Sequence, residues 1–345
     1  MHTLYREIHQ QPAILAAALE RERAAVQRLA EALAARQLPL AMIVARGTSD
    51  HAAVYGKYLL ESLASLPVAL AAPSLYTLYK RPPRLDQAFV IAISQSGQSP
   101  DLVAVLTEAK RQGALTAALV NERDSPLAAT AEHVLWCGSG VERAVAATKS
   151  YTAQLFLLAM LVAAITGDER LHAGLAGVPA AVSVALALDR RIHDIAVEQK
   201  EMDRCVVLAR GYAYATALEV ALKIKETSYV VADAYSGADF LHGPIAVIDP
   251  GFPALLFAAD GPALPGILDL ARLLQARRAF TIAVTDDARL AGAVERPLLL
   301  PTKQQEELAP IVQIVVGQLF AYHLSVAKGY DPDQPRGLRK VTITH

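Results

Sequence analysis

Short apolar runs alternate along the chain with longer stretches in which apolar residues recur every three or four positions. The short runs are rich in aliphatic and β-branched residues, which is typical of buried strands, whereas the longer stretches have helical spacing. Strands that alternate with helices predict parallel βαβ units. In the first half we expect strands at 40–45, 68–70, 89–93, 114–120 and 134–137. We expect one or two helices within 4–36, helices at 50–65 and 142–165, and a polar link at 76–81.

The second half of the chain repeats the first at a separation of 164 positions. Similar local sequences surround three pairs of residues with this separation: Gly47 and Gly211, Gly97 and Gly261, and Gln154 and Gln318. The strand at 115–120 matches 280–284 at nearly the same separation. The repeat predicts two tandem α/β units, each a parallel sheet of about five strands sandwiched by helices in three αβα layers.

The same pattern divides the chain into segments. Helical sequence near 170–200 is expected to join the two units. We place a helical segment at 1–36, a first unit at 37–168, a second unit at 195–330 and a tail at 331–345.

The composition narrows the choice of partners and compartment. The 33 basic and 34 acidic residues leave no charge surplus to favour nucleic acid or an anionic membrane, so neither is expected as a partner. The longest apolar run, Leu155–Ile165, is well short of the roughly 20 residues that span a bilayer, and it predicts a buried helix. The N-terminus has no basic segment followed by a hydrophobic one, so the expected compartment is the cytoplasm.

The cysteines and histidines suggest no redox or metal chemistry. Cys137 and Cys205 are far apart, neither lies in a CxxC motif, and both are expected in the core. The nine histidines lack the spacings of metal ligands, so no metal site is expected.

The strand at 89–93 runs directly into a hydroxyl-rich turn, Ser94-Gln-Ser-Gly-Gln-Ser99, and helical spacing resumes at Leu102. The first N–H groups of a helix lack internal partners and carry the positive end of its dipole, and serine hydroxyls add neutral donors. This turn therefore suits a phosphate monoester without a lysine, and an ordinary helix-capping serine is the alternative. The second copy has Ala258-Ala-Asp-Gly261 here, so only the first copy is expected to bind phosphate.

Two further stretches carry candidate acid–base groups. A predicted helix after Gly211 places Glu219, Lys223 and Glu226 on one face. An acid beside a lysine in a cleft is a candidate base, although the spacing alone favours a solvated stripe of ion pairs. Residues 233–244 are expected to form a long polar loop with His242 before Gly-Pro. Long loops in compact α/β units are often functional, so His242 is a candidate acid–base group. The alternative is that His242 is an ordinary surface histidine.

Six motifs, in this order, resemble one known family. They are Gly47-Thr48-Ser49, Ser94-Gln-Ser-Gly97, Ala147-Thr148-Lys149, Ala217-Leu-Glu-Val-Ala-Leu-Lys-Ile-Lys-Glu226, His242-Gly-Pro244, and Asp333-Gln-Pro-Arg336 followed by Lys340. Together they resemble the isomerase half of glucosamine-6-phosphate synthase (glutamine–fructose-6-phosphate aminotransferase), which consists of two SIS (sugar isomerase) domains. The resemblance covers essentially the whole chain.

The resemblance implies a role for each matching residue. Glu226 would be the base that moves a proton between C1 and C2 of the sugar, with Lys223 as its neighbour. His242 would assist ring opening from the partner subunit of a homodimer with shared active sites, and Lys340 would lie on a tail that folds over the site. This chemistry needs no metal or cofactor. The sugar phosphate would contact Thr48, Ser49, Ser94, Gln95, Ser96, Ser99, Ala147 and Lys149.

Departures from the family pattern bear on the reaction. Ala238-Asp-Phe-Leu241 stands where the family has Gly-Glu-(Leu/Phe)-Lys, and Arg46 replaces a small residue. The glutaminase domain of the synthases has no counterpart in this sequence, so no channelled ammonia is expected. We therefore expect a glucosamine-6-phosphate deaminase of the SIS type that yields fructose 6-phosphate and ammonia.

Other reactions remain open. A plain aldose–ketose isomerase and a deglycase acting on phosphorylated fructosamines are alternatives within the enzyme class. An alternative of another class is a sugar-phosphate-binding regulatory module, which needs no base. The presence of Glu226, Lys223, His242 and Lys340 favours an enzyme.

Overall fold

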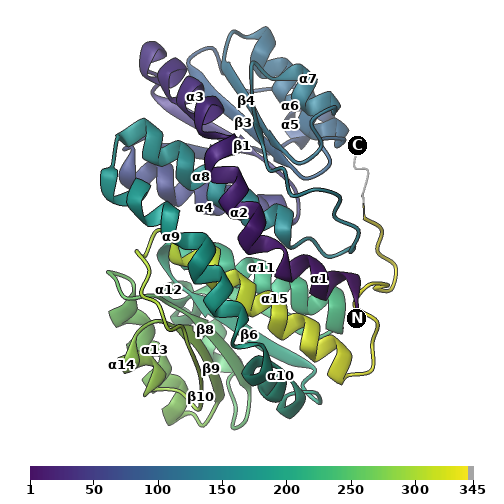
Figure 1. Cartoon of the computed structure of the whole chain (residues 1–345), viewed down its shortest axis with the longest axis vertical. Helices are drawn as coiled ribbons and strands as arrows, with labels where there is room; N and C mark the ends of the chain where they lie inside the picture. The colour runs from purple at the N-terminus through teal and green to yellow at the C-terminus, as the bar shows by residue number, and fades with distance from the viewer. Residues whose placement is uncertain (341–345) are drawn as a thin grey trace. The chain divides into compact units, whose positions relative to one another are not determined.

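The computed structural model describes residues 1–340, which form two compact units (Figure 1). The first-sheet unit comprises Ala13–Glu142, Lys149–Ala176 and the tail from Arg339. The second-sheet unit comprises Met1–Pro12, Arg143–Thr148 and Gly177–Leu338. The predicted tail at 331–345 is therefore described only to Lys340, and its last five residues lie outside the described residues.

The first sheet has five parallel strands in the order β2-β1-β3-β4-β5, as the alternating pattern predicted. The hydroxyl-rich turn follows the central strand β3, every residue of which is buried. A central strand packed on both faces is a rigid support for the loop at its carboxyl end. The strands are β1 (Leu40–Val44), β2 (Val68–Leu70), β3 (Ala88–Ser94), β4 (Leu115–Val120) and β5 (His133–Trp136).

Helices cover both faces of the first sheet (Figure 1). On one face Leu102, Val105 and Leu106 of α6 pack against Val90 and neighbouring apolar residues of the strands. Helices α5 and α7 flank α6, whereas α3, α4 and α8 cover the other face. These helices are α3 (Arg23–Arg36), α4 (Thr48–Leu63), α5 (Ser74–Thr77), α6 (Pro100–Arg111), α7 (Pro126–Thr130) and α8 (Lys149–Thr166), and α2 (Gln11–Arg21) precedes α3 in the chain.

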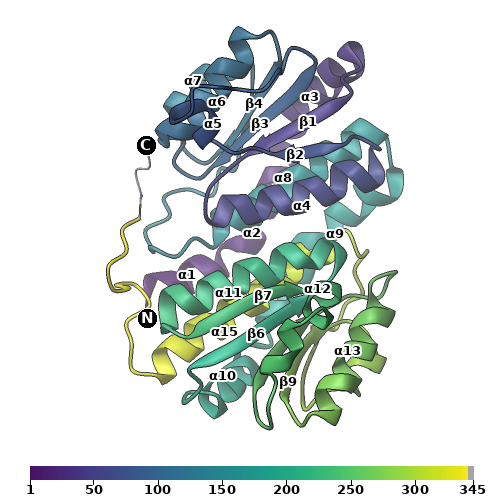
Figure 2. The ribbon, with the colours of Figure 1, turned by 180° about the vertical axis from the view of Figure 1, so that it is seen from behind.

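The second sheet repeats this architecture, which confirms the predicted tandem fold (Figure 2). Its parallel strands have the order β10-β9-β8-β6-β7, the same topology as the first sheet when each unit is counted from its own first strand. Gln154 in α8 and Gln318 in α15 thus occupy equivalent helices. The strands are β6 (Arg204–Ala209), β7 (Val231–Ser236), β8 (Pro253–Phe257), β9 (Phe280–Thr285) and β10 (Arg296–Leu299).

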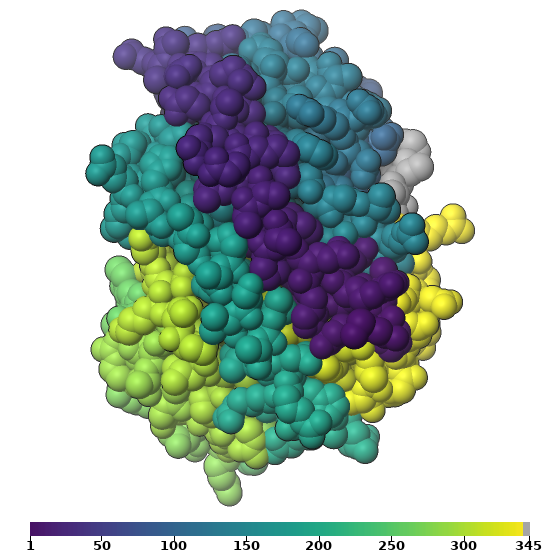
Figure 3. Space-filling model, viewed as in Figure 1, coloured from purple at the N-terminus to yellow at the C-terminus, as the bar shows by residue number. Residues whose placement is uncertain are grey.

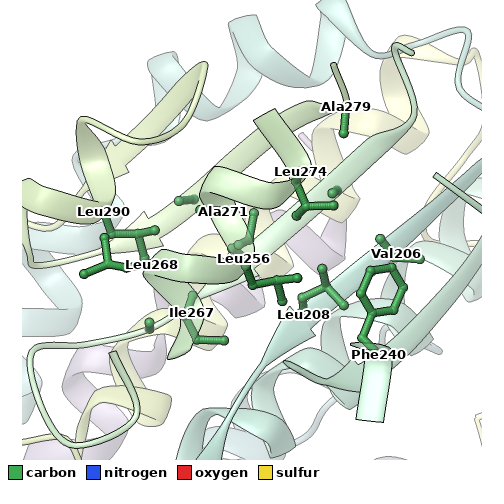
Figure 4. Close-up of a cluster of buried hydrophobic side chains, with 14 of the residues drawn as sticks. Val206, Leu208, Phe240, Leu256, Ile267, Leu268, Ala271, Leu274, Ala279 and Leu290 are labelled. Atoms are coloured by element: carbon green, nitrogen blue, oxygen red, sulfur yellow. The ribbon is translucent and has the colours of Figure 1, made fainter. Parts of the chain in front are cut away.

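The core of the second-sheet unit has a helix layer on each face. Figure 4 shows Leu274 of α13 over Leu256 and Leu208 of the sheet, with Phe240 of α12 alongside. Helices α10, α11 and α15 cover the opposite face. The remaining helices are α1 (Thr3–His9), α9 (Glu169–Leu186), α10 (Asp189–Glu198), η1 (Gly211–Ala213), α11 (Tyr214–Ser228), α12 (Gly237–Leu241), η2 (Pro244–Val247), α13 (Leu264–Ala276), α14 (Ala288–Ala291) and α15 (Ala309–Ala327).

The most apolar helices lie inside the folded chain. Among the described residues, α8 and α15 are long and apolar enough to cross a membrane, and the bent pair α9 and α10 would make a third span. However, 83% of the apolar window in α8 and 94% of that in α15 are buried. The predicted buried helix at 155–165 is therefore confirmed, and Cys137 and Cys205 are free, buried thiols as expected.

Four local predictions were wrong or incomplete. The N-terminal region has three helices rather than one or two, with breaks at Gln10 and Glu22. The expected link at 76–81 begins in α5, where Tyr76 packs into the core. Residues 142–148 are not helical, and the backbone N–H groups of Arg143 and Ala144 bind the distant Glu7 carboxylate instead of helix carbonyls. The expected loop at 233–244 is edge strand β7 followed by α12, since an edge strand retains the polar residues that indicate a loop.

Candidate functional site

The hydroxyl-rich turn forms a preorganised loop at the start of α6. The backbone N–H of Gly97 donates to Ser94 Oγ at 3.0 Å, and that of Gln98 donates to Ser96 Oγ at 3.3 Å. These hydroxyls accept from the backbone and keep their own O–H groups as donors. Within residues 1–340, Ser99 occupies the N-cap position of α6 without a side-chain capping bond. Ser99 therefore does not act as an ordinary helix-capping serine.

Gly97 is required by the shape of this loop. Its φ of +62° lies in the left-handed region, and a Cβ at this position would overlap Ser125 Oγ. Ser125 itself caps α7 by accepting from the backbone N–H of Ala128. A side chain at position 97 would consequently shift the loop, α7, or both.

We expect Gly97→Ala to weaken phosphosugar binding by roughly tenfold or more, because a left-handed alanine costs about 1 kcal/mol and the clash displaces the hydroxyls. Gly113→Ala is a matched control, since Gly113 also has a positive φ, +87°, but its Cβ would have no neighbour within 4 Å. Calorimetric titration with glucitol 6-phosphate measures the difference. Equal affinities of the two variants would contradict the role of the loop.

The turn after β1 adds a buried hydroxyl and a cation to this edge of the first sheet. Ser49 is 7% exposed and its Oγ accepts from Gln154 Nε2 at 3.0 Å, and Thr48 begins α4 directly before it. Arg46 Nε donates to Asp101 Oδ2 at 2.8 Å, across to the first turn of α6. The Asp101 side chain is 1% exposed and that of Arg46 is 50% exposed. Sequence reasoning noted Arg46 only as a departure and missed this ion pair.

The segment before α8 holds the described end of the tail. Glu142 accepts from the backbone N–H of Ser150 at 3.1 Å, from Ser150 Oγ at 2.7 Å and from Lys340 Nζ at 2.8 Å. The Glu142 side chain is fully buried, so it fixes the Lys340 ammonium on the first-sheet unit. Sequence reasoning did not single out Glu142, although it lies five residues before Ala147, which is half-buried.

Lys149, a predicted contact of the sugar phosphate, is buried and binds the backbone. It is 4% exposed, and its Nζ donates to the carbonyl of Val141 at 2.8 Å. A buried ammonium that binds a backbone carbonyl stabilises the segment between them. The structure thus gives Lys149 a role in holding the 141–149 segment.

The second-sheet unit contains a buried charged triad on α11. Lys223 Nζ lies 3.3 Å from Glu219 Oε1 and 2.5 Å from Glu226 Oε2. The Glu219 and Lys223 side chains are 0% and 3% exposed, whereas Glu226 is 23% exposed. The prediction of a solvated stripe of ion pairs, which the spacing favoured, is therefore wrong. Glu226 is the partly exposed end of a buried triad.

The triad keeps its lysine charged. Burial acts to lower the pKa of Lys223, but the carboxylates of Glu219 and Glu226 outweigh it and raise that pKa above its usual range. The lysine therefore remains an ammonium ion at every pH at which the protein is expected to work. A fixed ammonium orients the Glu226 carboxylate and compensates its charge.

His242 lies apart from the triad within this unit. It is exposed, and its backbone N–H donates to the carbonyl of Asp239 at the end of α12. Helices α11 and α12 cover opposite faces of the second sheet. The second-sheet unit thus does not bring His242 and Glu226 together.

The family assignment follows from the comparison with known protein families. The SIS domain model matches twice, at residues 37–164 and 200–328, once for each sheet. The chain belongs to the SIS domain family. The SIS family resemblance predicted from the motifs is therefore confirmed.

Curated relatives agree with this assignment. Glutamine–fructose-6-phosphate aminotransferase (isomerizing) from Pyrococcus horikoshii is 36% identical over 99% of this chain, and the match covers 58% of that protein. The chain thus spans about three-fifths of the length of the curated relatives it matches. It is homologous over its full length to the isomerase half of those enzymes.

Solved structures share the fold. A putative phosphosugar isomerase from Silicibacter pomeroyi is 34% identical with a TM-score of 0.88, covering 96% of this chain and 100% of that one. The C-terminal domain of the aminotransferase from Francisella tularensis is 28% identical with a TM-score of 0.87, covering 97% and 98%. A glucosamine-6-phosphate deaminase from Thermotoga maritima, at 21% identity and a TM-score of 0.80 over 99% and 100%, shows the common fold alone.

Proposed function

We propose that this SIS chain is an aminosugar-phosphate enzyme that converts glucosamine 6-phosphate and water into fructose 6-phosphate and ammonia. The observation that carries the proposal is the buried ammonium of Lys223, which holds the partly exposed Glu226 carboxylate at 2.5 Å. Ion pairs that only stabilise a surface are normally solvated, whereas this one is buried and leaves one carboxylate accessible. A regulatory module that only binds a phosphosugar has no need of such a group.

The hydroxyl-rich loop would anchor the phosphate of the substrate. Ser94, Ser96 and Ser99 supply O–H donors, and the start of α6 supplies backbone N–H groups and the positive end of its dipole. In this proposal Gln95 and the turn Thr48–Ser49 contribute further polar groups beside the loop.

Glu226 would move the proton that converts the open-chain aldose into the ketose. With glucosamine 6-phosphate the carboxylate removes the proton from C2, an enolamine forms, and the proton returns at C1. The resulting imine at C2 takes up water and breaks its C–N bond, so that the ketose and ammonia leave. The Lys223 ammonium is not itself the base, since its raised pKa keeps it protonated.

His242 and Lys340 complete the proposed machinery. A histidine suits ring opening because imidazole both gives and takes protons near neutral pH. Its distance from Glu226 within one unit supports a homodimer in which a second copy provides His242. Lys340, held by Glu142, would place the tail over the bound sugar, and the cytoplasm is the expected compartment.

The direction of the reaction follows from mass action in the assay. Without ammonia or an ammonia donor in the mixture, amination of the ketose cannot run, so the proposed chemistry proceeds only as hydrolysis of the aminosugar phosphate to the ketose and ammonia. Purified protein with glucosamine 6-phosphate should release ammonia and fructose 6-phosphate in equal amounts. A panel with glucose 6-phosphate, tagatose 6-phosphate and a phosphorylated fructosamine separates the alternatives. Turnover of one of these without ammonia release from glucosamine 6-phosphate would overturn the deaminase assignment and leave an isomerase or deglycase.

Ser96→Ala tests the phosphate anchor. We expect KM to rise about tenfold with kcat within about twofold, because the lost hydroxyl binds the substrate and the transition state equally. Steady-state kinetics of ammonia release measure both constants. Ser183→Ala, which removes an exposed hydroxyl from α9, should change neither constant. A fall in kcat at unchanged KM would place Ser96 in the chemical step instead.

A further inference from the structure

The N-terminal helix α1 binds the segment Arg143–Thr148 from a distance of more than 130 positions in sequence. Glu7 is 4% exposed, and its two carboxylate oxygens accept from the backbone N–H groups of Arg143, at 2.7 Å, and Ala144, at 3.2 Å. Both bonds lie within the second-sheet unit. One carboxylate thus fixes the direction of two successive N–H groups at the start of the segment.

A relay of buried amides fixes the other end of the same segment. Gln11 Nε2 donates to Gln318 Oε1 at 2.9 Å, and Gln318 Nε2 donates to the carbonyl of Thr148 at 3.4 Å. Gln11, Gln318 and Thr148 are at most 2% exposed. The first residues of the chain therefore bind both ends of Arg143–Thr148, directly through Glu7 and through Gln318 on α15.

Residues 143–148 have no regular secondary structure, so side chains must fix their conformation. The segment includes Ala147, and covalent bonds join it to Glu142, which holds Lys340, and to Lys149. We propose that Glu7, Gln11 and Gln318 are positioning residues that set the conformation of Arg143–Thr148 and thereby of the sugar-binding groups next to it. The statement that the segment lies beside sugar-binding groups rests on the proposed function. The contacts of Glu7, Gln11 and Gln318 with the segment do not depend on it.

The base of the tail is attached to the same helix. Asp333 accepts from the backbone N–H groups of Thr3 at 2.7 Å and Leu4 at 2.8 Å, at the start of α1. Figure 3 shows the residues of α1, in purple, beside the yellow C-terminal stretch. Helix α1 therefore contacts both the tail that leads to Lys340 and the segment that follows Glu142. A seven-residue helix is unstable by itself, so these hydrogen bonds hold it in place together with the burial of Leu4 and Ile8.

The carboxylate at position 7 supports a role in positioning the segment Arg143–Thr148 rather than a role only in packing α1. Apolar side chains could bury α1 at a lower desolvation cost than an ionised glutamate. A carboxylate instead binds N–H groups at fixed angles and rejects alternative conformations of the segment. Loss of one acceptor oxygen should therefore disturb the segment more than it disturbs global stability.

Glu7→Gln tests this, because glutamine has the same shape and keeps only one acceptor oxygen. Hydrogen exchange should show the amides of Arg143 and Ala144 exchanging at least tenfold faster, with the rest of the chain unchanged. The Kd of glucitol 6-phosphate should rise or kcat should fall by roughly tenfold, since small displacements of positioned groups are costly. Inhibition by inorganic phosphate, which needs only the serine loop, should be unaffected.

Glu20→Gln is the matched control, because Glu20 is an exposed glutamate of the N-terminal region that pairs with Arg23. It should match the unsubstituted protein in every measurement. Unchanged exchange at Arg143 and Ala144 in Glu7→Gln would overturn the inference, and so would faster exchange with wild-type affinity and kcat. If the unsubstituted protein turned over no phosphosugar, the proposed function would fail, while the exchange and binding measurements would still decide the positioning role.

Discussion

Replacing Glu226 by Gln is expected to lower kcat by about a thousandfold while the Kd of glucitol 6-phosphate stays within about threefold, because a positioned general base contributes roughly 10² to 10⁴ to the rate. The amide keeps the size of the side chain and can still contact Lys223, but it cannot take the proton from C2. Ammonia release measures kcat, and calorimetric titration measures binding.

Two variants sharpen this test of Glu226. Glu226→Asp keeps the carboxylate but withdraws it by one methylene, so intermediate activity is expected. Glu198→Gln removes an exposed carboxylate that pairs with Arg296 on the same unit and should leave kcat unchanged. Near wild-type turnover of Glu226→Gln would remove Glu226 from the proton transfer and reopen the regulatory-module alternative.

Replacing Lys223 by Met should lower the free energy of unfolding by about 3–5 kcal/mol, because it leaves the buried carboxylate of Glu219 without its cation. Methionine matches the length and flexibility of the lysine stem, so the loss reflects charge rather than an empty cavity. Urea denaturation followed by circular dichroism measures the change.

Lys225→Met is the matched control, since Lys225 lies two residues later on α11 and is exposed. It should change stability by less than about 0.5 kcal/mol. The double variant Glu219→Gln with Lys223→Met should recover much of the loss, because it removes the uncompensated buried charge. If Lys223→Met were no more harmful than Lys225→Met, the triad would not be an electrostatically coupled buried unit.

The strand–turn–helix pattern was sufficient for the fold. The strands of the first sheet are local apolar runs, and the second half of the chain repeats the first at a constant separation, so those strands and the tandem architecture could be predicted without tertiary information. The hydroxyl-rich loop could be found for the same reason. Ser94, Ser96 and Ser99 are adjacent in sequence, and the loop that they form depends on the strand before and the helix after it.

Burial of charge could not be predicted in this way. Glu219, Lys223 and Glu226 have the spacing of an ordinary exposed ion-pair stripe, and only the packing of the neighbouring helices decides that the first two are excluded from water. Periodicity reports which residues share a face of a helix, but not what covers that face. The assignment of 233–244 to a loop failed similarly, because edge strand β7 is identified by its pairing with β6 rather than by its own composition.

The sequence by itself therefore determined two tandem SIS units, the hydroxyl-rich loop before α6 and the residue types of the candidate site. Only the tertiary structure decided that Arg46 pairs with Asp101, that Lys340 binds Glu142, and that Glu7 holds Arg143 and Ala144. These contacts join residues between 55 and 198 positions apart. Local patterns arise from hydrogen bonds and apolar periodicity within a few turns of the chain. The partner of a buried charge depends instead on which group the completed fold brings next to it.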